Sequence, residues 1–138
     1  MGRIYNIFSE KEAPPSTHSV KTANLILPLI LKYTSEAVGK TATLSMKMDD
    51  LPANSRDFQK MVKEFDSAIE KWVDRIHRLG AVAKGLWLVD FDTGDGYLCW
   101  SYPERRVEYF HSYDTGFKNR KKIEETPFPS TSSKPSKA

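Results

Sequence analysis

The chain has few of the residues and patterns that define familiar classes of protein. Its single cysteine excludes an internal disulfide bond and is typical of a protein in a reducing compartment. The longest apolar run, residues 25–31, is seven residues long and contains Pro28, far short of the roughly 18 residues that span a membrane. The first residues lack the charged-then-apolar pattern of a signal peptide. We therefore expect a cytoplasmic protein with no membrane contact.

The chain also lacks the short motifs of the main catalytic and cofactor-binding classes. It has no phosphate-binding glycine loop, no dinucleotide glycine fingerprint, no paired-cysteine motif, no zinc-protease helix and no nucleophile elbow. The segment Gly94-Asp95-Gly96 resembles part of a calcium loop, but it lacks the regular spacing of acids and the closing glutamate. The sequence therefore favours a non-enzymatic protein, and we expect no cofactor.

The net charge of +3 is concentrated at the carboxyl-terminal end. From Phe117 onward the chain carries six lysines and arginines against two glutamates, whereas the preceding part is slightly acidic. A nucleic-acid-binding domain is expected to carry a basic face on the fold itself. The distribution disfavours nucleic-acid binding, and only the cluster at 118–122 keeps that function as an alternative.

Composition divides the chain into three parts. Residues 1–18 form an amino-terminal segment with a proline-rich connector, and residues 19–123 are predicted to form a single domain. A short edge strand is expected in the first segment at Ile4, Tyr5, Ile7 and Phe8. Residues 124–138 are rich in proline, serine and lysine, which predicts a disordered tail.

A long helix is predicted from Ser19 to the Asp49-Asp50 pair. The hydroxyl of Ser19 can accept a hydrogen bond from a free backbone N–H of the first turn. Apolar or small residues then recur with alternating spacings of three and four, the pattern of a helix with one buried stripe. The stripe consists of Val20, Ala23, Leu27, Ile30, Thr34, Ala37, Thr41, Leu44 and Met48. Pro28 removes one helical hydrogen bond, so we expect a bend there.

A second helix is predicted to begin between Pro52 and Ser55 and to end before Gly80. Its stripe is entirely apolar and consists of Phe58, Val62, Phe65, Ile69, Trp72, Ile76 and Leu79. Two such helices joined by a short loop form an antiparallel hairpin. A hairpin with heptad stripes can pair with a second copy into a four-helix arrangement, so we expect a homodimer.

After Gly80 the apolar period changes to two, which predicts strands. Trp87–Phe91 and Tyr97–Tyr102 flank a turn sequence at 92–96, and a third strand is expected at Arg106–His111. The chain is therefore predicted to be an α+β protein. A long antiparallel two-helix hairpin packs with a C-terminal three-stranded antiparallel β-meander.

The faces of this meander depend on the strand register. If all of residues 92–96 form the loop, Phe91 pairs with Tyr97 and Cys99 lies opposite Val89. The face of Asp90 then carries Leu88, Asp90, Leu98, Trp100, Val107, Tyr109 and His111. Cys99 lies on the other face, where we expect it to be a buried apolar side chain.

Asp90 and His111 are the main candidates for a functional site. Asp90 lies between Val89 and Phe91, where an unpaired carboxylate is costly, so it needs a partner such as His111 or Arg120. The set either forms a structural hydrogen-bonded pair or binds a small anion. Candidate ligand-binding residues are Asp90, Glu104, His111 and Arg120. One aspartate and one histidine are fewer ligands than a metal site usually has, so no metal is expected.

Several short motifs follow one another in a fixed order across residues 19–123. They are Ala23-Asn24, Leu27-Pro28, Lys84-Gly85, Leu88–Phe91, Leu98–Trp100, His111, Gly116-Phe117 and Arg120. The combination resembles the prokaryotic family known as domain of unknown function 2203. Phe110 stands where the family pattern has a tryptophan, and Lys121-Lys122 stands where it has a pair like Gln-Pro. The resemblance implies a bacterial cytoplasmic protein in which Asp90, His111 and Arg120 act as a set, but it supplies no activity.

Three functions follow from these patterns. The first is a non-enzymatic binding or scaffolding module that self-associates through its helical hairpin or holds another protein. The second is a small anionic-ligand site, or a minor enzyme, built on the meander from Asp90, Glu104, His111 and Arg120. The third is weak nucleic-acid binding through the basic C-terminal end.

Overall fold

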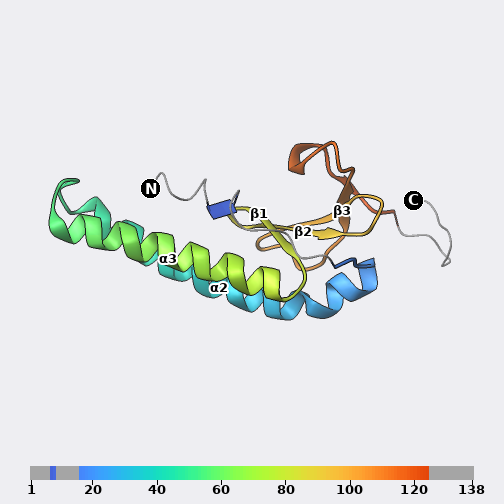
Figure 1. Cartoon of the computed structure of the whole chain (residues 1–138), viewed down its shortest axis with the longest axis horizontal. Helices are drawn as coiled ribbons and strands as arrows, with labels where there is room; N and C mark the ends of the chain where they lie inside the picture. The colour runs from blue at the N-terminus through green and yellow to red at the C-terminus, as the bar shows by residue number, and fades with distance from the viewer. Residues whose placement is uncertain (1–6, 9–15, 125–138) are drawn as a thin grey trace.

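The computed structural model describes residues 7–8 and 16–124, and the structural statements below concern these residues. A hairpin of two long helices lies against a five-stranded antiparallel sheet (Figure 1). The predicted α+β class is confirmed. Ile7 and Phe8 are helical, so the edge strand expected there is wrong, and Ile4, Tyr5 and most of the predicted tail lie outside the described residues.

The first helix of the hairpin, α2, spans Val20–Asp49. The Ser19 hydroxyl accepts a hydrogen bond from the Thr22 N–H at 3.1 Å, as an N-cap should. Every residue of the predicted stripe is buried except Val20. In Figure 1 the first turns of α2 rise away from the line of the rest of the helix, which fits the bend expected from Pro28.

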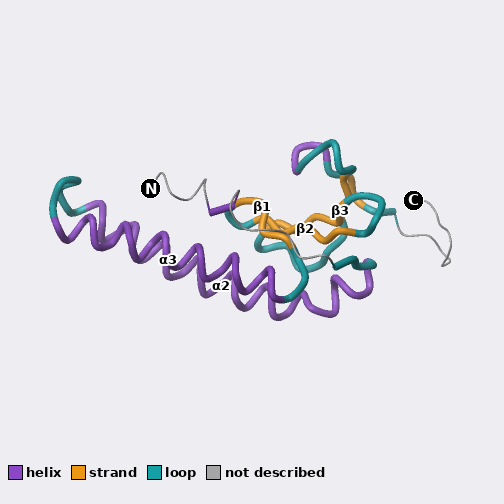
Figure 2. The backbone as a smooth tube through the Cα atoms, viewed as in Figure 1, coloured by secondary structure: helices purple, strands orange, loops and turns teal. Residues whose placement is uncertain are grey.

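The second helix, α3, spans Arg56–Arg78 and runs antiparallel to α2 (Figure 2). Ser55 caps it by accepting from the Phe58 N–H at 3.1 Å. Only part of the predicted stripe is fully buried, namely Ile69, Trp72 and Ile76, while Phe58, Val62, Phe65 and Leu79 are half-buried. For Phe58, Val62 and Phe65 the difference arises because the sheet covers one end of the hairpin and leaves the other end without a cover (Figure 2).

The sheet has its five strands in chain order, each antiparallel to the next. They are β1 (Val82–Gly85), β2 (Leu88–Asp92), β3 (Tyr97–Ser101), β4 (Tyr109–His111) and β5 (Lys121–Lys122). The three strands of the predicted meander correspond to β2, β3 and β4. The two outer strands add to it on both edges, and they are too short to show an apolar alternation in the sequence.

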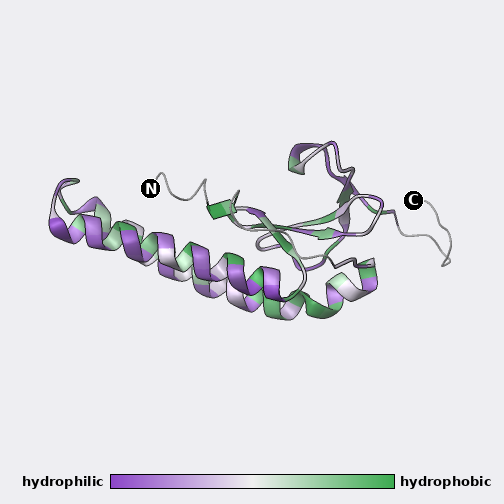
Figure 3. Ribbon diagram, viewed as in Figure 1, coloured by the Kyte–Doolittle hydropathy of each residue, from purple (hydrophilic) through white to green (hydrophobic). Residues whose placement is uncertain are grey.

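One face of the sheet packs on the helices to form the core. Val89, Phe91, Leu98 and Trp100 of the sheet belong to the same buried cluster as Leu27, Ile30, Ile69, Trp72, Val73 and Ile76 of the helices. The indole N–H of Trp72 donates to the Thr34 hydroxyl at 2.8 Å, which satisfies both buried polar groups. The part of α2 next to the sheet is also its most hydrophobic part (Figure 3). No helix among the described residues is long and apolar enough to cross a membrane.

Candidate functional site

The register of β2 and β3 places Asp90 directly opposite Cys99. The predicted register, which put Cys99 opposite Val89, is wrong by one residue because Asp92 pairs with Tyr97 and the loop is four residues long. The Thr93 N–H and hydroxyl both donate to the Gly96 carbonyl at 2.9 Å and close this shorter loop. A slip of one residue moves a side chain to the opposite face of a sheet. Cys99 therefore shares the face of Asp90.

The same shift corrects the predicted neighbours of Asp90. Leu98 and Trp100 lie on the core face and not beside Asp90, and the register between β3 and β4 pairs Cys99 with Tyr109. His111 keeps its predicted place on the face of Asp90. The outward face of the three central strands thus brings together one carboxylate, one thiol and one imidazole from β2, β3 and β4.

Asp90 and His111 form a buried pair. The Asp90 Oδ2 atom lies 3.0 Å from His111 Nε2, and the two residues are only 3 % and 5 % exposed. The other ring nitrogen, Nδ1, lies 2.9 Å from the Ser112 carbonyl oxygen. Because a carbonyl oxygen can only accept, Nδ1 carries a proton and donates it. The contact between Nε2 and Oδ2 then holds a further proton, shared between an imidazole and a carboxylate, and the pair is neutral overall.

Burial shifts the protonation of both acids in this cluster. Burial raises the pKa of the Asp90 carboxyl, and the charge of His111 and a hydrogen bond from the Cys99 thiol partly oppose that rise. Burial, together with the neighbouring Asp90, raises the pKa of the Cys99 thiol to about 12, while Arg120 opposes the change. At neutral pH Cys99 is therefore a thiol and a poor nucleophile.

The remaining two candidates, Glu104 and Arg120, form a second pair. Arg120 Nη1 donates to Glu104 Oε1 at 3.0 Å, and Nη2 donates to Oε2. The guanidinium also lies over the rings of Tyr109 and Phe117, at 3.9 Å and 4.3 Å from their centroids. Glu104 chiefly accounts for the raised pKa of Arg120. Arg120 is therefore the partner of Glu104 and not of Asp90.

The four predicted site residues thus form two pairs, and Cys99 connects them. The thiol lies next to Asp90, which raises its pKa, and is close enough to Arg120 for the guanidinium to oppose that rise. Sequence analysis missed this role because of the loop. The signal for the shorter loop was Asp92, whose Oδ1 atom accepts from the Gly94 N–H at 2.9 Å as an aspartate commonly does in a tight turn.

Among the residues that the structure describes, Asp90, Cys99 and His111 form a group that could hold a metal ion. The ligand atoms of Asp90, Cys99 and His111 all lie within 4.8 Å of one another, and all three side chains are buried. A thiolate, an imidazole and a carboxylate form a common donor set for zinc and related ions.

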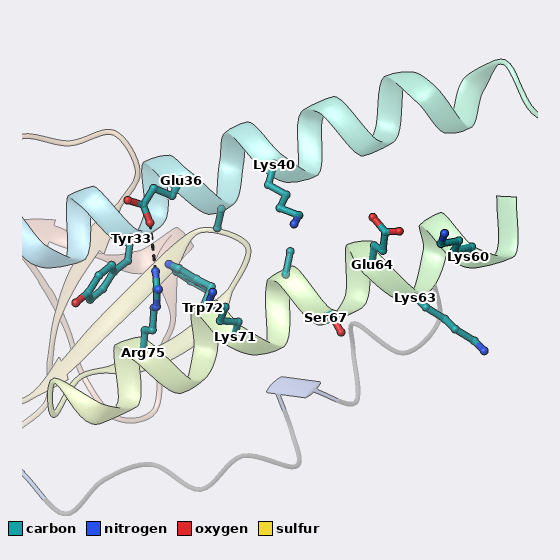
Figure 4. Close-up of a pocket in the computed structure, with 12 residues that line it drawn as sticks. Tyr33, Glu36, Lys40, Lys60, Lys63, Glu64, Ser67, Lys71, Trp72 and Arg75 are labelled. Carbon is teal, nitrogen blue, oxygen red and sulfur yellow. Dashed lines mark hydrogen bonds and ion pairs between the residues drawn. The ribbon is translucent and has the colours of Figure 1, made fainter. Parts of the chain in front are cut away.

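A groove of about 530 Å³ runs between the two helices, on a side that sequence analysis did not single out (Figure 4). Trp72 and Tyr33 lie toward one end, where the Arg75 guanidinium sits 4.6 Å from the Tyr33 ring centroid and 3.2 Å from Glu36 Oε1. Lysines and one further glutamate lie along the rest, namely Lys40, Lys60, Lys63, Glu64 and Lys71. The groove therefore has an aromatic end and a charged rim of both signs.

Comparison with known proteins adds a family but no activity. Residues 16–123 match the sequence model of a family described as an uncharacterised conserved protein, DUF2203. Comparisons of the chain with curated proteins and with solved structures gave no match.

Proposed function

The chain belongs to the DUF2203 family of uncharacterised conserved proteins, and we propose that it is a non-enzymatic binding module that self-associates through the α2–α3 hairpin. The observation that carries the proposal is the contrast along α3. Ile69, Trp72 and Val73 are buried where the sheet covers the hairpin, whereas Phe58 and Phe65 remain half-buried where it does not.

The outer part of the hairpin, residues 40–66, extends beyond the sheet (Figure 1). Two helices that pack only on each other cover one side of each apolar stripe. Phe58, Met61, Val62 and Phe65 therefore keep part of their surface in water, and Met46 on α2 is 71 % exposed. A second hairpin packed on this part would complete a four-helix arrangement and cover these side chains.

The size of the expected gain predicts a weak dimer. Full burial of a large apolar side chain is worth roughly 1.5–3 kcal/mol, so completing the burial of four partly buried ones on each of two hairpins contributes on the order of 5 kcal/mol. Association costs roughly 4–15 kcal/mol in lost freedom. We therefore expect a dimer that dissociates on dilution and not an obligate one.

The charges beside the stripe are compatible with a second copy as the partner. The groove carries two acids, Glu36 and Glu64, against four lysines and Arg75, so it has both signs but is mostly basic. Two copies of a face with both signs can be arranged so that acids meet bases, as in paired helices with charged flanks. A face with a single sign would repel its own copy.

The test is the molar mass of the untagged protein by light scattering, from low to high micromolar concentration. The mass should rise with concentration for the wild type, and Met61→Glu should hold the protein as a monomer at every concentration. Leu25→Glu is the matched control, because Leu25 is 68 % exposed at the other end of the hairpin and receives the same charge. A wild type that stays monomeric throughout contradicts the proposal.

The two alternative functions have less support from the geometry. An anion at Arg120 would have to displace both oxygens of Glu104, which already satisfy the guanidinium. The basic cluster at 118–122 contributes Arg120 to that internal pair, so only its exposed lysines are available to phosphate. We therefore favour the hairpin as the binding surface.

A further inference from the structure

We propose that Asp90, Cys99 and His111 bind a divalent transition-metal ion, with zinc as the best match. The three residues come from three adjacent strands, β2, β3 and β4, whose pairing fixes their spacing. They supply one oxygen, one sulfur and one nitrogen, and zinc accepts all three ligand types. The site is independent of the self-association proposed for the hairpin.

The distances are close to those of a tetrahedral site. The three ligand atoms lie within 4.8 Å of one another, and Oδ2 of Asp90 is 3.0 Å from Nε2 of His111. Metal bonds of about 2.0–2.3 Å at tetrahedral angles place ligand atoms roughly 3.3–3.8 Å apart. Side-chain movements of a fraction of an ångström would therefore admit the ion between them.

His111 is already oriented as a ligand. Its Nδ1–H donates to the Ser112 carbonyl, which leaves Nε2 directed at Asp90 in the cluster. Histidines that bind metals almost always donate their other ring N–H to a carbonyl or carboxylate, because that bond fixes the ring and its tautomer. The same bond also satisfies a buried N–H, and its value for metal binding is that it holds the ring with Nε2 facing Asp90.

A divalent ion can bind here without leaving a net charge in the cluster. Without metal the cluster holds a neutral thiol and a neutral aspartate–histidine pair that contains one shared proton. A divalent ion would displace the thiol proton and the shared proton, and the ion with its thiolate, carboxylate and neutral imidazole again carries no net charge. Two protons leave for each ion bound. The buried site therefore accepts the ion without an unpaired charge, which would be costly there.

Arg120 supports the thiolate without repelling the ion. Its positive charge lowers the pKa of the Cys99 thiol against the rise that burial causes, so it favours the deprotonated form. Its own charge is matched by Glu104 through two hydrogen bonds. Three protein ligands leave one tetrahedral position for water or a small ligand, as in zinc sites with an open position.

The first test is titration of the untagged, reduced protein with Co²⁺, which substitutes for zinc and is coloured. Cys99 is the only cysteine in the chain, so a thiolate-to-cobalt charge-transfer band reports this residue alone. We expect the band to saturate at about one ion per chain and to disappear when Zn²⁺ is added. Absence of the band at millimolar Co²⁺, on protein that is folded by circular dichroism, overturns the proposal.

Variants separate the cluster from other sites. Asp90→Asn keeps the shape of the side chain and should weaken Co²⁺ binding roughly tenfold or more. His18→Gln is the matched control, because His18 lies outside the cluster and bonds to the Gly80 carbonyl, and binding should be unchanged. Equal affinities in all three proteins would mean that the ion binds elsewhere.

A measurement on the wild type keeps the test valid where a variant fails to fold. X-ray absorption of the zinc-loaded protein should show one sulfur and at least two nitrogen or oxygen neighbours. A shell of nitrogen and oxygen alone would show that Cys99 is not a ligand and would overturn the proposal.

Discussion

Asp90 in the sheet and Asp66 in the hairpin are both buried aspartates, at 3 % and 7 % exposure, and they differ in what surrounds them. Asp90 is hydrogen-bonded to His111 and lies opposite Cys99 on the neighbouring strand. Among the described residues, the Oδ1 atom of Asp66 has no hydrogen-bond partner. A buried polar atom with partners holds a fold in one arrangement, whereas one without them costs stability. In the sheet the buried carboxylate therefore has its hydrogen-bond partner, whereas in the outer hairpin a buried carboxylate oxygen lacks one among the described residues.

The largest expected change in stability comes from removing Asp90, the aspartate that has a partner. Asp90→Ala removes the partner of His111 and leaves a buried imidazole without compensation. Breaking a buried pair in this way costs about 3–5 kcal/mol of unfolding free energy. Urea denaturation measures the loss. Asp95→Ala is the control, because Asp95 is exposed in the loop that follows β2, and the cost there should stay below about 0.5 kcal/mol.

The next prediction concerns the part of the hairpin that the sheet covers. Thr34→Val keeps the shape of the side chain but removes the acceptor of the Trp72 indole N–H, which is buried. An unsatisfied donor of this kind costs about 1–3 kcal/mol. Thermal and urea unfolding should both show the loss. Thr43→Val, at an exposed position of the same helix, should change stability by less than about 0.5 kcal/mol.

The contrast also explains what the sequence could predict. The stripe of α2 was predictable at every position except Val20, because helical periodicity is local and a buried face shows directly in the spacing. The α+β class followed from the change of period after Gly80. Strand β5 was not predictable, because its two lysines join the sheet through backbone bonds and their side chains are exposed.

The sequence predicted which residues belong to the candidate site, but it did not predict which of them pair with each other. Asp90 had to have a partner, and His111 was a correct choice because the face pattern brought the two together. Arg120 pairs with Glu104, a choice that depends on the path of the chain between 102 and 120 and on no local pattern. Cys99 was assigned to the wrong face because a loop of four residues and a loop of five look alike in the sequence. The two loop lengths place the side chains of the following strand on opposite faces of the sheet.

The smallest expected change in stability comes from replacing Asp66, the aspartate with an oxygen unpaired among the described residues, and here we expect the protein to become more stable. Asp66→Leu removes a buried acceptor that has no partner among the described residues, and leucine is also the better helix former. We expect the free energy of unfolding to rise by about 1 kcal/mol, measured by urea denaturation. Glu64→Leu is the control, since Glu64 is exposed on the same helix and the change should be within about 0.5 kcal/mol of zero. A destabilised Asp66→Leu would mean that this carboxylate has a stabilising partner, and that the two buried aspartates do not differ in the way proposed.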